Sequence, residues 1–304
     1  LNLANYGVFQ IGEPSPLTVS TQPNNSTVCA TAGAAFTSSS TAVPAPTIQW
    51  QRGIAGIYAD IDASLDAGVY SGFNTSTLTI SNASGLDGYT YRAVFTNING
   101  SINSNAATLT VYPVSVGGLV SGDSTVCLGS LANAFNLTGQ VGNVLRWEKS
   151  NNIGFSSPVV INNTSSTLTG AQLGAIFATT YVRAVVQSGS CSVVTSSVGT
   201  VTMIDTYAGV ISADQDVCAG YAPSDVHLSN PIGQVIRWEV SDDLFFMNPQ
   251  IISNTTTTLT GAEIGVVTQD TYVRAIVQNQ GCAVKESGAV RIAVTPASVG
   301  GTIS

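Results

Sequence analysis

The chain has 304 residues, of which 44% are hydrophobic and only 9% are charged, and its formal net charge is −8 at pH 7. The apolar content excludes a disordered chain, and the scarcity of Lys and Arg excludes binding to nucleic acid or to an anionic membrane surface. Every apolar run is shorter than the 18 residues that a membrane-spanning helix needs, so we expect no membrane span.

An internal repeat divides the chain into units. Between 118 and 287 the sequence repeats at a constant offset of 91 residues without insertion. The matched pairs include Cys127 and Cys218, Trp147 and Trp238, Tyr181 and Tyr272, Arg183 and Arg274, and Cys191 and Cys282. Trp50 centres a looser third copy. A fixed period of this size is typical of an array of like modules, which we place at 14–112, 113–204 and 205–296.

The two ends of the chain are predicted separately. Residues 1–13 lack the features of a signal peptide, and we interpret them as an N-terminal segment or the end of a preceding module. Residues 298–304, SVGGTIS, repeat the SVGGLVS of 115–121, so 297–304 are predicted to be the first strand of a following module. We expect that this strand comes from truncation of a longer chain; the alternative is exchange of the strand between molecules.

Every module is predicted to be β-structure. Its segments alternate in polarity or are rich in branched and aromatic residues. The clearest are 75–81, 89–97, 107–112, 143–150, 180–187 and 234–241. Turn residues separate them every 8–12 residues, which is typical of a sandwich. The segments 170–178 and 261–269 are helix-like but too short and glycine-broken for more than one turn. Joins of only a few residues predict a stiff, elongated array.

Strand alternation predicts which side chains face the core. Trp50, Trp147 and Trp238 are expected inside their sandwiches, and Glu148 on the outer face opposite Arg183 of the neighbouring strand. The same spacing pairs Glu239 with Arg274. In the first module, Arg92 faces Gln51 instead of a carboxylate, so we expect no ion pair there.

The five cysteines carry the strongest chemical signal. Cys127 and Cys191 are 64 residues apart, as are Cys218 and Cys282, which predicts the disulfides Cys127–Cys191 and Cys218–Cys282 within modules and an oxidising compartment. The alternatives are unpaired buried thiols or, with less support, a metal site. Cys29 lacks such a partner because Gly100 occupies the matching position, so we predict that it is unpaired or bonded outside this chain.

Several motifs resemble a known group of modules. VCATAG (28–33), PAPTIQWQ (44–51), DGYTYRAV (87–94), STVCLGS (124–130) and TYVRAVVQSGSC (180–191) resemble the immunoglobulin-like and PKD-like repeats of large Bacteroidota cell-surface adhesins. This resemblance implies tandem immunoglobulin-like β-sandwich domains, export by the type IX secretion route, and a role in adhesion or gliding. In that group O-linked sugars sit on Asp-Ser/Thr motifs, which makes Ser124 a candidate for glycosylation.

The remaining candidate sites are weak. Asp60, Asp62 and Asp66, or Asp123 and Asp214, have oxygen ligands suited to calcium, but loop solvation and turn formation explain them better.

Two further features are noted on the sequence. His227 lacks the nucleophile and orienting group that a general base needs. Phe245 and Phe246 form an aromatic pair that either packs in the core of the third module or contacts a ligand or the adjoining module.

We therefore expect a non-enzymatic stalk segment without a cofactor. Its expected partners are neighbouring modules of the same or another chain, and surface glycans or other cells. The alternatives are a self-assembling fibre subunit joined by residues 298–304 and carbohydrate-binding accessory modules of a secreted enzyme.

Overall fold

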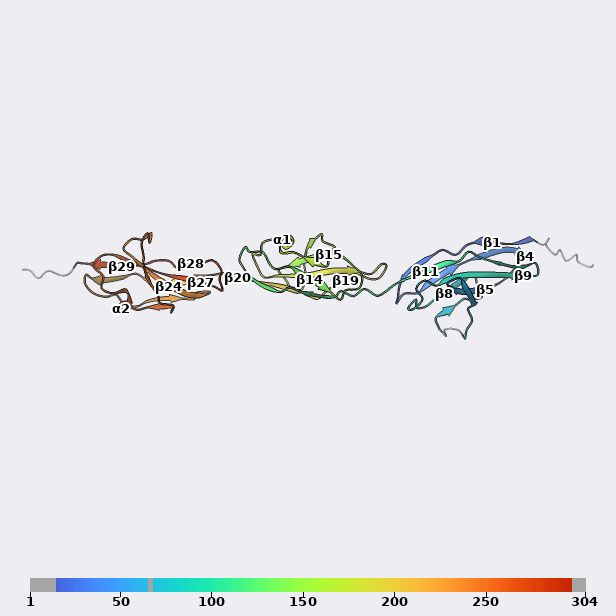
Figure 1. The fold of residues 1–304 in the computed structure, drawn as a ribbon, viewed down its shortest axis with the longest axis horizontal. Coiled ribbons are helices and arrows are strands. Elements are labelled where there is room, and N and C mark those ends of the chain that lie inside the picture. Colours follow the sequence, from blue (N-terminus) through green and yellow to red (C-terminus); the bar gives the residue numbers. More distant parts are fainter. Residues whose placement is uncertain (1–14, 65–67, 297–304) are drawn as a thin grey trace, which may run out of the picture.

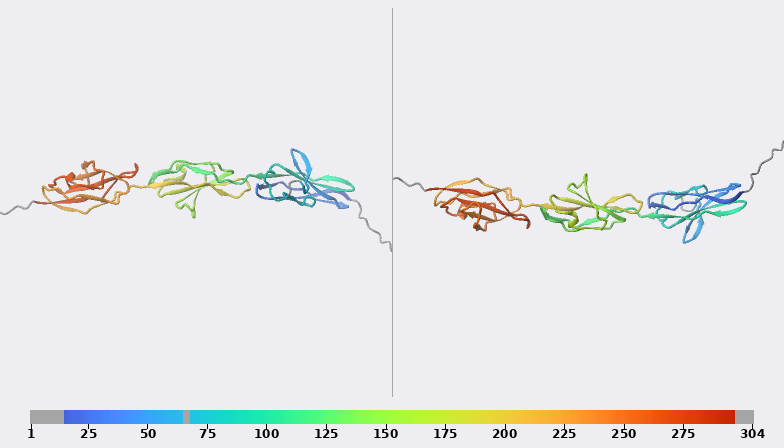
Figure 2. Two further views of the ribbon diagram at one scale, coloured as in Figure 1. Left: turned by 90° about the horizontal axis from the view of Figure 1, so that it is seen from below. Right: turned by 90° about the horizontal axis from the view of Figure 1, so that it is seen from above.

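The computed structural model describes residues 15–64 and 68–296, which form three β bodies joined end to end (Figure 1). Views from above and below show the same linear order, so the array is elongated (Figure 2). The tandem immunoglobulin-like architecture is confirmed. The expected segments 1–13 and 297–304 lie outside the described residues.

Module 1 contains a six-stranded sheet and two smaller ones. The large sheet has the order β2 (Ser26–Cys29), β11 (Ala107–Tyr112), β9 (Thr90–Asn97), β5 (Thr47–Ile54) and β6 (Ile57–Asp60), with β10 (Gly100–Asn103) also beside β9. The facing strands are β3 (Ala34–Thr37), β8 (Thr77–Ile80) and β7 (Tyr70–Ser71), and β1 (Ser15–Thr21) pairs with β4 (Ser39–Val43).

Modules 2 and 3 share one topology of six strands facing three. In module 2 the sheets are β13 (Ser124–Cys127), β20 (Gly199–Ile204), β18 (Thr180–Gln187), β15 (Asn143–Ser150) and β16 (Val159–Ile161), with β19 (Val194–Thr195) beside β18, and β12 (Leu119–Ser121), β14 (Phe135–Thr138) and β17 (Thr167–Leu168). In module 3 they are β22 (Gln215–Cys218), β29 (Val290–Thr295), β27 (Thr271–Gln278), β24 (Gln234–Ser241) and β25 (Gln250–Ile252), with β28 (Lys285–Glu286) beside β27, and β21 (Val210–Ile211), β23 (Val226–Ser229) and β26 (Thr258–Leu259).

A tryptophan lies in the centre of each core. Trp50, Trp147 and Trp238 are fully buried. Each indole N–H donates to a backbone carbonyl at 2.9 to 3.0 Å, so burial leaves no unpaired donor. In the adjacent strand the residue opposite each indole is a buried alanine, which leaves room for the ring.

Each of the two helical segments is a single turn, as predicted: α1 (Gly170–Leu173) and α2 (Gly261–Ile264). Both begin with a capping box, in which Thr260 and Glu263 satisfy each other's backbone N–H groups in α2. The first residue of α2 is Gly261, and a Cβ atom there would lie 1.8 Å from the carbonyl oxygen of Pro223. The turn therefore packs on the chain at a distance that only glycine permits.

This contact gives a stability prediction for module 3. Gly261→Ala is expected to lower the free energy of unfolding by about 2 kcal/mol, because backbone atoms must move to admit the methyl group. Gly288→Ala is the matched control: a Cβ there meets nothing within 4 Å, and we expect a change within about 0.5 kcal/mol. Hydrogen exchange of peptides from β23 and β27 measures the stability of this module alone. Equal effects of the two substitutions would contradict the packing argument.

Candidate functional site at the module junctions

The disulfides join neighbouring modules, and not the two ends of one module. Cys29 is bonded to Cys191 and Cys127 to Cys282, with Cα–Cα distances of 4.8 and 5.5 Å. Cys218 is a free, exposed thiol. The predicted bonds Cys127–Cys191 and Cys218–Cys282, and the unpaired or externally bonded state predicted for Cys29, are therefore wrong.

Strand direction explains the correction. Cys127 ends β13, which runs parallel to β20 with Cys127 opposite Ile204, so it lies where the chain leaves module 2. Cys191 follows β18, which is antiparallel to β20, so it lies at the opposite end of the module. An eight-residue strand spans about 25 Å, whereas disulfides need Cα atoms within about 7 Å. A bond within the module is therefore geometrically excluded, and the nearest sulfur belongs to the neighbouring module.

Hydrogen bonds and packing reinforce the first junction. The hydroxyl of Ser115, in the linker, accepts a bond from the backbone N–H of Ser188 at 2.9 Å. The ring of Tyr112 packs directly against Gly189, where a Cβ atom would lie 2.1 Å from the ring. Gln187 donates its side-chain amide to the carbonyl of Cys191 and fixes the turn that carries the sulfur.

The second junction repeats this arrangement. Thr206 takes the place of Ser115, and its hydroxyl accepts from the N–H of Asn279 at 3.2 Å. The Asn279 side chain donates to the carbonyl of Asp205, which adds a second link to the linker. Gln278 donates to the carbonyl of Cys282 at 2.9 Å, as Gln187 does in module 2. Each junction is thus held by one covalent bond and by hydrogen bonds from the following module to the linker.

A buried carboxylate lies on the outer face of the large sheet in modules 2 and 3. Glu148 lies opposite Arg183, as predicted, and accepts from it at 2.8 Å, while Arg146 binds its other oxygen at 2.7 Å. Although Glu148 lies on the outer face of the sheet, it is only 3% exposed. Phe155, from the loop between β15 and β16, packs against the Arg183 guanidinium, which lies 4.1 Å from the ring centroid. Glu239 repeats the arrangement in module 3.

The electrostatics of Glu148 follow from this geometry. Burial raises the pKa of its carboxyl, but the hydrogen bonds and positive charges of Arg146 and Arg183 outweigh burial and bring the pKa below its ordinary value. The carboxylate therefore stays ionised and structural. In module 1, Arg92 donates to Gln51 at 2.8 Å and Gln51 donates to Asp60, so a neutral amide stands in place of the carboxylate, as predicted.

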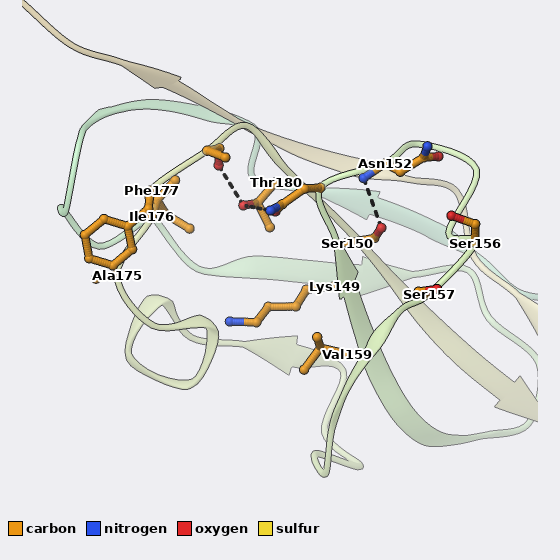
Figure 3. A pocket seen from close by; sticks show the side chains of 12 residues that line it. Lys149, Ser150, Asn152, Ser156, Ser157, Val159, Ala175, Ile176, Phe177 and Thr180 are labelled. Carbon is orange, nitrogen blue, oxygen red and sulfur yellow. Dashed lines mark hydrogen bonds between the residues drawn. The ribbon is translucent and has the colours of Figure 1, made fainter.

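A surface pocket of about 520 Å³ lies in module 2 between the start of the β15–β16 loop and the segment after α1 (Figure 3). Lys149 is the one charged residue in its lining, and its ammonium group donates to the carbonyl of Leu173 at 2.6 Å. Phe177 lies at one side of the pocket and Ser156 and Ser157 at the other. This lining contains no carboxylate or histidine to act as a base, and the ammonium group of Lys149 is already engaged by the carbonyl of Leu173.

The candidate calcium ligands within the described residues each hold a local turn or strand. Asp123 accepts from the N–H of Thr200 and Asp214 from that of Arg291, both at 2.8 Å, so each ties a turn to a neighbouring strand. Asp60 accepts from Gln51, and Asp62 from Ser64. Asp66 lies outside the described residues. Within 15–64 and 68–296, no group of three His, Cys, Asp or Glu side chains is arranged to hold a metal ion.

The remaining candidate side chains lie apart from one another. His227 is exposed, and its Nδ1 lies 3.0 Å from the hydroxyl of Thr258. Phe246 is buried beneath Arg274, whereas Phe245 is 82% exposed, so the pair does not act as one unit. The Ser124 hydroxyl oxygen is buried without a hydrogen-bond partner, which argues against attachment of a sugar there once the module is folded.

A family model matches modules 2 and 3 almost completely. The domain of unknown function DUF8696 matches residues 116–205 and 207–296, which together are more than half of the chain. The chain belongs to this family. Each of the two matched modules carries one cysteine at each end. The first cysteine of module 2, Cys127, is bonded to Cys282 of module 3, and the second, Cys191, is bonded to Cys29 of module 1.

Other comparisons find part of an enzyme and distantly similar solved structures. The chain is 38% identical over 98 residues to endoglucanase C of Cellulomonas fimi; the match spans 32% of this chain and 8% of that protein. The solved I67–I69 fragment of titin covers 93% of this chain and 99% of its own at 13% identity, with a TM-score of 0.48. The four N-terminal immunoglobulin domains of Dscam1 cover 94% of this chain and 79% of theirs at 10% identity, with a TM-score of 0.35. No helix within the described residues has the length and apolar character to cross a membrane.

Proposed function

We propose that this chain is a non-enzymatic structural stalk segment of a cell-surface protein, holding other parts of that protein away from the cell. The observation that carries this proposal is the covalent bond at both described junctions. A disulfide beside a short linker removes most of the bending freedom that separate domains otherwise have. Stiffness along the array is what a spacer needs and what a compact enzyme does not.

The disulfides and the sequence motifs support a location outside the cell. Disulfides persist in oxidising surroundings, so the chain works outside the reducing cytosol. The resemblance of motifs such as 28–33 and 124–130 to Bacteroidota adhesin repeats supports display at the cell surface after type IX secretion, and a role in adhesion or gliding.

The test measures how far the chain holds a fluorescent tag from the surface to which the chain is anchored. The chain is anchored to a surface through its C-terminus, and the distance of an N-terminal fluorescent tag from that surface is measured. We expect a large and narrowly distributed distance for the oxidised chain. Replacing all four bonded cysteines by serine should shorten and broaden the distribution. A distribution equal to that of a Gly/Ser linker of the same residue number would contradict a stalk role.

A second candidate function is supported by the similarity to part of endoglucanase C. Here the modules would be accessory domains beside a catalytic domain of a secreted enzyme. Saturable binding of the oxidised chain to insoluble cellulose or to a glycan array would favour this function. The same chain denatured and reduced is the control for non-specific adsorption.

A further inference from the structure

Cys218 occupies a position that is bonded in both other modules. It ends β22, which runs parallel to β29 with Cys218 opposite Thr295, as Cys29 lies opposite Tyr112 and Cys127 opposite Ile204. The first two of these cysteines are each bonded to the turn of the next module. Cys218 is exposed at the corresponding end of module 3. Because Cys29 and Cys127 are both disulfide-bonded, they are independent evidence that a cysteine at this position forms a disulfide with the next module.

The chain itself offers no second sulfur for Cys218. The receiving cysteines, Cys191 and Cys282, are both occupied by bonds to earlier modules. Module 1 has no cysteine in the corresponding turn between β9 and β10, where the chain reads Ile98 and Asn99. A partner sulfur for Cys218 must therefore come from outside these three modules.

The sequence after module 3 supports such a partner. Thr295 to Ser298 read TPAS and are followed by VGG, as the linker 112–115 reads YPVS and is followed by VGG. In the first junction, Ser115 of this motif accepts the hydrogen bond from the following module. The sequence motif of the first linker is thus repeated after module 3.

We propose that Cys218 is the docking site for a following module of the same type, and that it forms a disulfide with the cysteine in the turn after that module's long central strand. The partner cysteine should lie four residues after a glutamine, as Cys191 follows Gln187 and Cys282 follows Gln278, because this amide fixes the turn. Two thiols form one S–S bond and release two protons and two electrons. A protein disulfide oxidant of the exporting compartment accepts the electrons and is reduced to a dithiol. This inference rests on junction geometry and is independent of the proposed function.

The first test extends the chain by one module. A second copy of residues 122–204 is added after Ser304, with its copy of Cys127 replaced by serine so that it contributes a single cysteine. We expect maleimide-reactive thiols to fall from one per chain to none, and peptide mapping without reduction to link Cys218 to the copied Cys191. The matched control replaces the copied Cys191 by serine as well, and should restore one reactive thiol. Equal labelling of the two chains, or a bond from Cys218 to any other cysteine, would overturn the proposal.

The second test uses the protein as its own cells produce it. Mass spectrometry of unreduced peptides should find Cys218 joined to a cysteine that lies four residues after a glutamine. A free Cys218, a Cys218–Cys218 dimer, or a partner outside such a turn would each refute the proposal even if the extended chain behaved as expected.

Discussion

Stretching the oxidised chain between Leu1 and Ser304 should give less than half the extension of the reduced chain. The two disulfides overlap in sequence, because Cys127 lies between Cys29 and Cys191. The shortest covalent path therefore runs along 1–29, crosses to 191, returns to 127, crosses to 282 and continues to 304. At ~3.5 Å per residue this path is about 410 Å long, against about 1,060 Å for the full chain.

The physical reason is that the remaining residues lie in covalently closed loops. Residues 30–126 and 192–281 are off the shortest path and carry no load after their modules unfold. Force is transmitted through the sulfur bonds, and the linkers are bypassed. The end-to-end length of such a stalk therefore increases only to a limited extent when a module unfolds.

Single-molecule force spectroscopy with and without a thiol reductant measures this difference. The double variant Cys29→Ser, Cys191→Ser should give a final length of about 525 Å, and the double variant Cys127→Ser, Cys282→Ser about 500 Å. Each variant keeps one of the two disulfides, and that disulfide shortens the covalent path. Bonds within modules would predict different lengths for every variant. An oxidised chain that extends to about 1,060 Å would show that the bonds between modules are absent.

Most of the fold is predictable from the repeat, because the repeat preserves the alternation of polar and apolar residues along each strand. Alternation around Trp147 and Trp238 places the indoles inside, and the same parity puts Glu148 opposite Arg183. The burial of Glu148 could not be predicted in this way. Arg146 and Arg183 bind the two oxygens of Glu148, and a loop brings Phe155 over Arg183; loop positions are not encoded in strand alternation.

The predicted disulfide pairing is wrong because equal spacing of cysteines within modules carries no information on strand direction. Cys127 and Cys191 recur at one interval whether each bonds within its module or to a neighbour. The deciding signal was the third cysteine, Cys29, which matches Cys127 and Cys218 in a module without a receiving turn. Three cysteines end the strand that leads to the next module, and two lie in the turn that contacts the preceding module. These numbers fit disulfides between neighbouring modules, with Cys218 left without a partner in this chain.

Glu148→Gln should destabilise module 2 by about 2 kcal/mol. Removing one partner from a buried ionic cluster is costly because the opposite charges remain. Here the cost is reduced, because the side chains of Arg146 and Arg183 are 39% and 25% exposed and are partly screened by water. Hydrogen exchange of β15 and β18 peptides should accelerate by about 30-fold.

The matched control is an exposed pair in the same chain. Asp270 accepts from the N–H of Val294 and pairs with Arg291, and these contacts lower the pKa of its carboxyl. Its side chain is 40% exposed and screened by water, so Asp270→Asn should lower the free energy of unfolding much less than Glu148→Gln does. Similar losses in the two variants would show that burial of Glu148 contributes nothing.

The pH dependence distinguishes loss of charge from loss of packing. Because the folded-state pKa of Glu148 lies below its ordinary value of 4.5, its contribution is fully present at pH values above that point. It disappears as the pH falls through the folded-state pKa, since both folded and unfolded carboxyls are then protonated. The stability difference between the parent chain and Glu148→Gln should therefore shrink as the pH is lowered below about 4.5. A difference that is constant with pH would assign the effect to packing of the side chain and would remove the electrostatic explanation.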